Sequence, residues 1–154
     1  MYKQILCPID GSKTSNCGMN EAIRLAKDQN AKLRFLHVID LYFPILDTTG
    51  DLNVVYIDEV LRRNAKHVLK KAEEVAHKAG ITADSKQIET MNSRVSEFIV
   101  AEAVEWPADL IVMGTHGLRG VERLVMGSDA ETVARTSPVP VLLVRSEPDK
   151  GHKK

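Results

Sequence analysis

The feature that most restricts the fold of this chain is the alternation of short apolar runs with longer segments of helical periodicity. An apolar run of about four to eight residues bounded by turn residues is typical of a strand. The runs cover residues 3–9, 33–39, 81–88, 110–113 and 139–144. Parallel strands need roughly a dozen connecting residues between them, and both faces of a parallel sheet must be covered. Helices between the strands meet both needs. The pattern therefore predicts an α/β fold with an open, mostly parallel, five-stranded doubly wound sheet.

Four helices are predicted between the strands, each with one apolar face. The first is capped by Ser12 or Ser15, and the second is long and amphipathic and ends at Gly80. The third is capped by Asn92 or Ser93. The strand at 81–88, between the second and third helices, is the most polar of the five and is predicted to lie at an edge of the sheet.

The length of 154 residues fits one domain, predicted over residues 1–145 and followed by a flexible tail over residues 146–154. Residues 40–53 show neither helical nor strand periodicity. We predict a loop there, with a lid over a binding site as one interpretation.

The charge is balanced, with 21 basic and 21 acidic residues. No positive field therefore favours nucleic acid or an anionic membrane surface. The sequence shows no signal peptide at its start and no apolar stretch near the roughly 20 residues of a membrane span. We expect a cytoplasmic protein without a nucleic-acid or membrane partner.

Cysteine and histidine spacing argues against a metal centre and against redox chemistry. Cys7 and Cys17 do not form a CxxC pair, and Cys7 lies within an apolar strand. The five histidines fall in different elements without ligand spacing, so no metal site is predicted. His116 lies in a loop, but no orienting carboxylate or nucleophile accompanies it, so no catalytic residue is predicted either.

A glycine-rich loop follows the fourth strand and begins at Gly114. It leads to a helix whose start, from Ser128 to Glu131, has the form of a capping box. Glycines allow close approach of the backbone to a ligand, and a helix N-terminus directs unpaired N–H groups at an anion. Asp10 follows the first strand at the same edge of the predicted sheet. The sequence therefore predicts a phosphate-binding loop with an acidic residue across a crevice.

These residues resemble the universal stress protein family over almost the whole chain. The nucleotide signature of that family is a glycine, two residues, a glycine, nine residues, a glycine and a Ser or Thr; Gly114, Gly117, Gly127 and Ser128 have this spacing. The opening at residues 5–12 is similar to the family's first strand and its acidic residue. Later strands are matched by residues 36–40, 108–114 and 137–144.

The resemblance implies the strand order 3-2-1-4-5 and an ATP or related adenine nucleotide, with or without Mg²⁺, between strands one and four. Asp10 and the backbone of Pro8 would contact the adenosine end. The backbone of Val38 would contact the adenine, and Met113 would form a wall of the site.

At the phosphate end, the resemblance places Gly114 and Gly117 where the loop closes over the ribose and the first phosphates. Gly127 and Ser128 would hold the phosphate tail. From the residues themselves, Arg119 and Arg123 are further candidates, because a guanidinium can pair with phosphate oxygens in a bidentate manner. They fit equally well as solvated side chains.

Asp129, directly after the predicted phosphate-binding serine, would repel phosphates unless it turns away or shares Mg²⁺.

The first hypothesis is an ATP-binding regulatory stress protein that is not an enzyme. It would form a homodimer through the apolar strand at residues 139–144. A slow ATP hydrolase or nucleotidyl-transfer enzyme is the second hypothesis. The third is a stress protein with an empty pocket that acts through its dimer surface.

Overall fold

A five-stranded parallel sheet forms the centre of the molecule, seen in a computed structural model that describes residues 1–41, 54–116 and 126–146. Its strands are β1 (Gln4–Pro8), β2 (Lys32–Asp40), β3 (Ala83–Thr90), β4 (Leu110–Gly114) and β5 (Val141–Val144). The order across the sheet is β3-β2-β1-β4-β5, and each neighbouring pair is parallel. The predicted fold class and strand order are confirmed, and the polar strand β3 lies at an edge.

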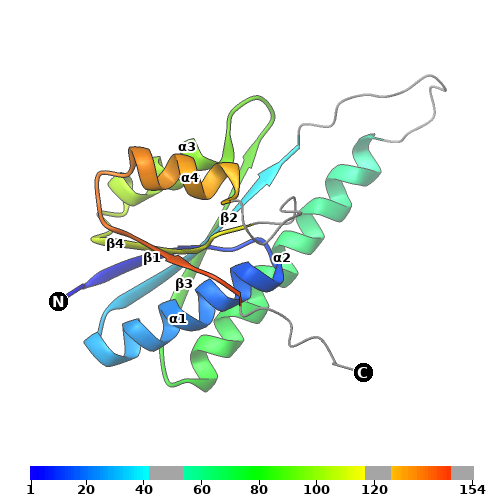
Figure 1. Ribbon diagram of the computed structural model, residues 1–154. Helices are drawn as coiled ribbons and strands as arrows, with labels where there is room; N and C mark the ends of the chain where they lie inside the picture. Colours follow the sequence, from blue (N-terminus) through cyan, green and yellow to red (C-terminus); the bar gives the residue numbers. More distant parts are fainter. Residues whose placement is uncertain (42–53, 117–125, 147–154) are drawn as a thin grey trace, which may run out of the picture.

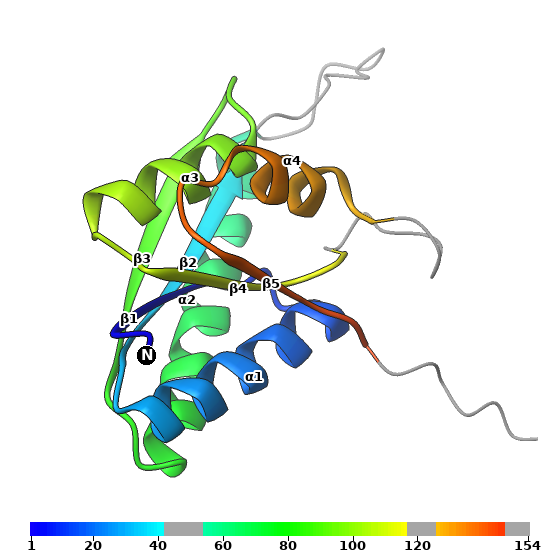
Figure 2. The same ribbon diagram turned by 60° about the vertical axis from the view of Figure 1, so that its left-hand side comes forward.

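Helices cover both faces of this sheet. They are α1 (Lys13–Gln29), α2 (Val54–Lys78), α3 (Val95–Glu105) and α4 (Ser128–Thr136). One face is covered by α1 and α2 and the other by α3 and α4 (Figures 1 and 2). Each helix follows a strand of a parallel sheet, so all four helices begin at the carboxyl edge of the sheet, where their N-terminal amide groups lie.

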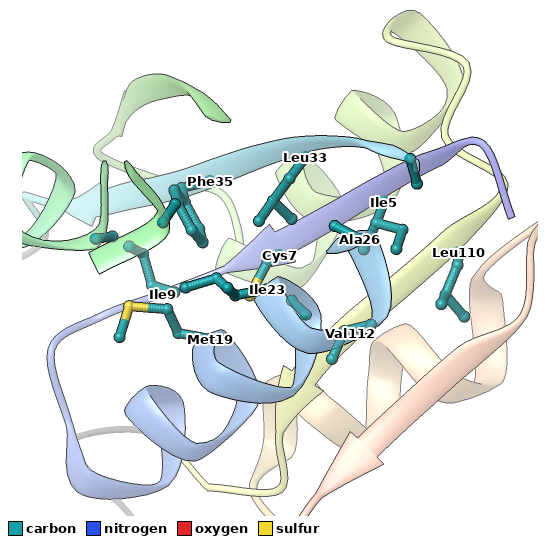
Figure 3. Packing of buried hydrophobic residues seen from close by; sticks show 14 of the residues in the cluster. Ile5, Cys7, Ile9, Met19, Ile23, Ala26, Leu33, Phe35, Leu110 and Val112 are labelled. Atoms are coloured by element: carbon teal, nitrogen blue, oxygen red, sulfur yellow. The ribbon is translucent and has the colours of Figure 1, made fainter. Parts of the chain in front are cut away.

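The alternation of side chains along β1 divides the core into two clusters. Ile5 and Cys7 point toward α1 and α2, together with Leu33 and Phe35 of β2 (Figure 3). Leu6 points to the opposite face and packs in the cluster below α3 and α4. The central strands are buried on both faces, which explains why their sequence is apolar without alternation.

Two of the predicted helix caps are confirmed. Ser12 is the N-cap of α1, and its hydroxyl oxygen accepts from the N–H of Ser15 at 3.2 Å. Gly80, beyond the end of α2, has a φ of +84°, a conformation that strongly favours glycine.

The predicted caps of the other two helices are wrong. Arg94, rather than Asn92 or Ser93, is the N-cap of α3. The reason is a turn in which the N–H of Ser93 donates to Thr90 Oγ1 at 3.1 Å, so the helix begins only after it.

The capping box predicted at Ser128 does not form either. Gly127 is the N-cap of α4, and Ser128 is already the first helical residue. The helix begins one residue early because the N–H of Gly127 donates to the carbonyl of Thr115 at 2.7 Å, which fixes the direction of the chain before the helix. Glu131, the other half of the box, pairs with Arg135 instead.

A charge cluster around one buried carboxylate joins α3 to β2 and β3. The carboxylate of Glu102, only 1% exposed, accepts from Arg34 Nη1 at 2.8 Å and from the ammonium group of Lys86. Arg34 also makes a bidentate pair with Asp84 and lies 4.7 Å from the ring centroid of Trp106. Trp106 is therefore a packing residue, as its position after a helix indicates.

Some sequence predictions lie outside the described residues, namely nearly all of the loop at 40–53 and the tail from residue 147 onward. None of the described helices is long and apolar enough to cross a bilayer.

Candidate functional site

The central feature of the carboxyl edge is a divergence between β1 and β4. The two strands pair only at Ile5 with Leu110 and at Leu6 with Ile111. Beyond that point β1 continues alongside β2, where Pro8 pairs with Leu36, and β4 continues alongside β5 as far as Gly114. The chain also reverses its direction across the sheet here: it runs from β1 outward through β2 to β3, and then places β4 and β5 on the other side of β1. A crevice at such a switch point is the usual ligand site of an open α/β sheet.

Asp10 lies on one side of this divergence, in a turn that is held by side chains. Its Oδ1 accepts from the N–H of Ser12 at 2.9 Å, and its own N–H donates to Ser15 Oγ at 3.0 Å. Gly11 has a φ of +83°, which lets the chain turn from β1 directly into α1. The half-buried carboxylate therefore has a fixed position directly beyond the end of β1.

On the other side, β4 ends in direct backbone contact with α1. A Cβ added to Gly114 would lie 2.7 Å from the carbonyl oxygen of Thr14, and one added to Gly18 would lie 2.9 Å from the backbone nitrogen of Gly114. Both distances are shorter than real Cβ contacts allow. Gly114 is thus required for packing, whether or not it also approaches a ligand.

Thr115 connects the end of β4 to two other elements. Its N–H donates to the carbonyl of Val144 in β5 at 3.0 Å, and its carbonyl accepts from the N–H of Gly127 at 2.7 Å. Its hydroxyl lies 2.9 Å from Nδ1 of His116. The two ends of the glycine-rich loop are therefore held together beside β5, and α4 begins next to the end of β4.

The N-terminus of α4 directs amide groups at the carboxyl edge of the sheet, next to the end of β4. The first bond within the helix runs from the N–H of Glu131 to the carbonyl of Gly127 at 3.0 Å. The amide groups that precede it belong to the helix end that attracts anions. Asp129 is half-buried in the same turn, and with Glu131 it adds negative charge there.

The structure brings most of the predicted site residues to one edge. Pro8 and Asp10 are at the end of β1, Met113 and Gly114 end β4, and Gly127 and Ser128 begin α4. Pro8 pairs with Leu36; Val38 lies two residues further along β2, and Asp10 lies two residues beyond the end of β1. Gly117, Arg119 and Arg123 lie outside the described residues.

His37 is a buried titratable group next to these residues that sequence reasoning did not single out. It is 7% exposed, and its Nδ1 has no hydrogen-bond partner among the described residues. Burial lowers the pKa of His37 below the ordinary 6.5, while the negative charge of Asp10 and a backbone hydrogen bond with Ile9 act in the opposite direction. The signal in the sequence is a histidine inside the mostly apolar run at residues 33–39.

Two other residues were also missed. Gly18 interrupts a helical pattern, which is a sequence signal for close packing. Thr115 carries no such signal, because its role depends on backbone bonds.

Cys7 is fully buried, and burial raises the pKa of its thiol far above neutrality, which agrees with the predicted inert role. Over the described part of the chain, no group of three or more His, Cys, Asp and Glu side chains is arranged to hold a metal ion.

The family model described as the universal stress protein family matches residues 1–145. The chain belongs to the universal stress protein family. A universal stress protein of Methanocaldococcus jannaschii is 34% identical over 145 residues, which cover 94% of this chain and 83% of that protein.

Solved structures of universal stress proteins share the fold of the chain. A family member from Burkholderia pseudomallei has 28% identity and a TM-score of 0.77, covering 94% of this chain and 97% of its own. A universal stress protein solved in complex with cAMP has 30% identity and a TM-score of 0.68, with 93% and 97% covered.

The contact between Gly114 and α1 predicts a stability effect that is independent of any ligand. Gly114→Ala should lower the free energy of unfolding of this universal stress protein by about 1–3 kcal/mol, because the new methyl group meets backbone that cannot rotate away. Urea denaturation without nucleotide measures this. Ser128→Ala, at an exposed residue with no cap bond, is the control and should change stability by no more than about 0.5 kcal/mol. Equal stability of the two variants would contradict the packing role.

Burial of His37 predicts a dependence of stability on pH. The pKa of His37 is lower in the folded state than the ordinary 6.5, so the folded state binds fewer protons. The contribution of His37 is fully present above about pH 6.5 and is lost as the pH falls toward the folded-state pKa. Denaturation curves at several pH values should show a steeper acid loss for the wild type than for His37→Gln. Parallel curves for the two proteins would refute this assignment.

Proposed function

We propose that this universal stress protein binds ATP in the crevice between β1 and β4. The observation that carries the proposal is the divergence of these strands, with Asp10 fixed beyond one and the N-terminus of α4 held beside the other through Thr115 and Gly127. A carboxylate can accept hydrogen bonds from the hydroxyl and amino groups of adenosine, while the helix end favours phosphate. The related structure in complex with cAMP supports an adenine nucleotide as the ligand.

The acidic first turn of α4 limits how strongly phosphate is attracted. Asp129 and Glu131 oppose the favourable dipole of the helix end. Mg²⁺ shared between the phosphates and Asp129 would remove this repulsion. We therefore propose that ATP binds with Mg²⁺ and that the affinity is modest.

We propose a binding protein rather than an enzyme. The imidazole of His116 is engaged at Nδ1 by the hydroxyl of Thr115, and the sequence has neither the P-loop nor the dinucleotide-binding glycine pattern. Nucleotide occupancy would act as the signal, through the surface of a cytoplasmic stress-response protein that partners recognise.

A homodimer through β5 completes the proposal. The four residues of β5 are apolar and half-buried, and β5 is the last strand of the sheet, so its outer side has no strand partner among the described residues. The opposite edge, β3, carries exposed polar residues such as Asp84, Ser85 and Glu89. Apolar edges associate, whereas charged edges resist strand pairing, so β5 is the edge suited to a second copy.

ATP with Mg²⁺ should raise the melting temperature by about 5–10 °C at about 100 times the dissociation constant, because a ligand that binds only the folded state adds stability. Asp10→Asn should reduce this rise, since the amide cannot replace both carboxylate acceptors. Asp28→Asn, at an exposed residue at the other end of α1, is the control and should keep it. No shift for the wild type, together with no adenine nucleotide released from the purified protein on denaturation, would contradict the proposal.

The edge strand predicts the oligomeric state. Sedimentation velocity should show a dimer for the wild type and a monomer for Leu143→Lys, since a charged side chain on an edge strand opposes pairing. Ser85→Lys, on the opposite edge, should remain a dimer. Circular dichroism verifies that both variants are folded. A dimer for Leu143→Lys with a monomer for Ser85→Lys would assign the interface to β3 instead.

A further inference from the structure

His37 lies at the centre of the proposed adenosine end without belonging to the nucleotide signature. It follows Leu36, the register partner of Pro8, and precedes Val38, the predicted adenine contact. Its ring makes a hydrogen bond with the backbone of Ile9, whose N–H donates to the carbonyl of Leu36 at 2.8 Å. Strand β2 thus holds Ile9 both by its backbone and by the imidazole, directly before Asp10.

The imidazole also lies within the field of the Asp10 carboxylate. In the neutral ring one nitrogen donates and the other accepts. Ile9 supplies a backbone partner for one nitrogen, and the buried Nδ1 is left without a partner among the described residues. A proton added to the ring would therefore create a buried cation within the field of the Asp10 carboxylate, which already accepts from Ser12.

Asp10 is the only charged group in the described part of the chain whose field shifts the titration of His37. From β1, the buried Cys7 remains a neutral thiol. From β3, the register partner of His37 is Gln87, which is uncharged. From α2, the side chain that approaches the turn at Gly11 is Val68, which is aliphatic.

We propose that His37 is a positioning residue of the nucleotide site, whose neutral imidazole holds Ile9 and Asp10 in the geometry that receives adenosine. This inference rests on the proposed function, because it concerns the affinity of the same site. Protonation of His37 draws the Asp10 carboxylate toward the ring and away from the ligand, so ATP binding weakens in acid. By linkage, bound ATP must disfavour the protonated form of His37 to the same extent.

The test compares the dissociation constant of ATP with Mg²⁺ at about pH 7.5 and about pH 5.5 by calorimetry, a range that spans histidine titration. His37→Gln keeps an uncharged N–H donor for the backbone of Ile9, and His77→Gln, at an exposed position on α2, is the matched control. Protonation of ATP itself is common to all three proteins and cancels in the comparison.

The acid weakening should be at least about threefold larger for the wild type and His77→Gln than for His37→Gln, since half a pKa unit corresponds to about that factor. Equal weakening in all three proteins overturns the positioning role while leaving ATP binding intact. Absence of ATP binding by the wild type at the higher pH instead refutes the proposed function, and the inference with it.

A second measurement does not depend on the folding of a variant. The imidazole resonances of His37 in the wild-type protein, followed by NMR against pH, should give a lower pKa with saturating ATP than without it. An unchanged or raised pKa would overturn the inference.

Discussion

The backbone contact between α1 and β4 is the constraint on which the rest of the carboxyl edge depends. Because Gly18 and Gly114 lack side chains, the helix packs against the end of the strand at a distance that no other residue pair would allow. That distance places the next residue, Thr115, where its backbone reaches both β5 and the start of α4. The position of the proposed phosphate-binding helix end therefore follows from a contact on the opposite face of the sheet.

Most of the fold could be predicted from the sequence, because strands buried on both faces and amphipathic helices leave clear patterns. The run that became β4 is apolar throughout, those that became β1 and β2 are mostly apolar, and Gly80 marks the end of α2. The starts of α3 and α4 did not follow the predicted caps. There, the bonds from Ser93 to Thr90 and from Gly127 to Thr115 determine where the helix begins, and the second of these joins residues that are distant in sequence.

The candidate site could be predicted in part for a related reason. Residues at the carboxyl ends of adjacent parallel strands must meet, so Asp10 and Gly114 could be placed from the order of elements and the glycine spacing. The structural requirement for Gly114 could not be predicted, since it arises from backbone contact with Thr14. Likewise, the charge cluster around Glu102 combines residues from three elements, and no local pattern reveals it.

The unequal edges of the sheet have a consequence for assembly. A sheet with two apolar edges can add copies at both sides and grow into an open-ended polymer. In this protein β3 carries charged side chains, whereas β5 is apolar. In the proposed homodimer, strand pairing between copies would occur once and stop there, so the same difference between the edges would also oppose fibre growth.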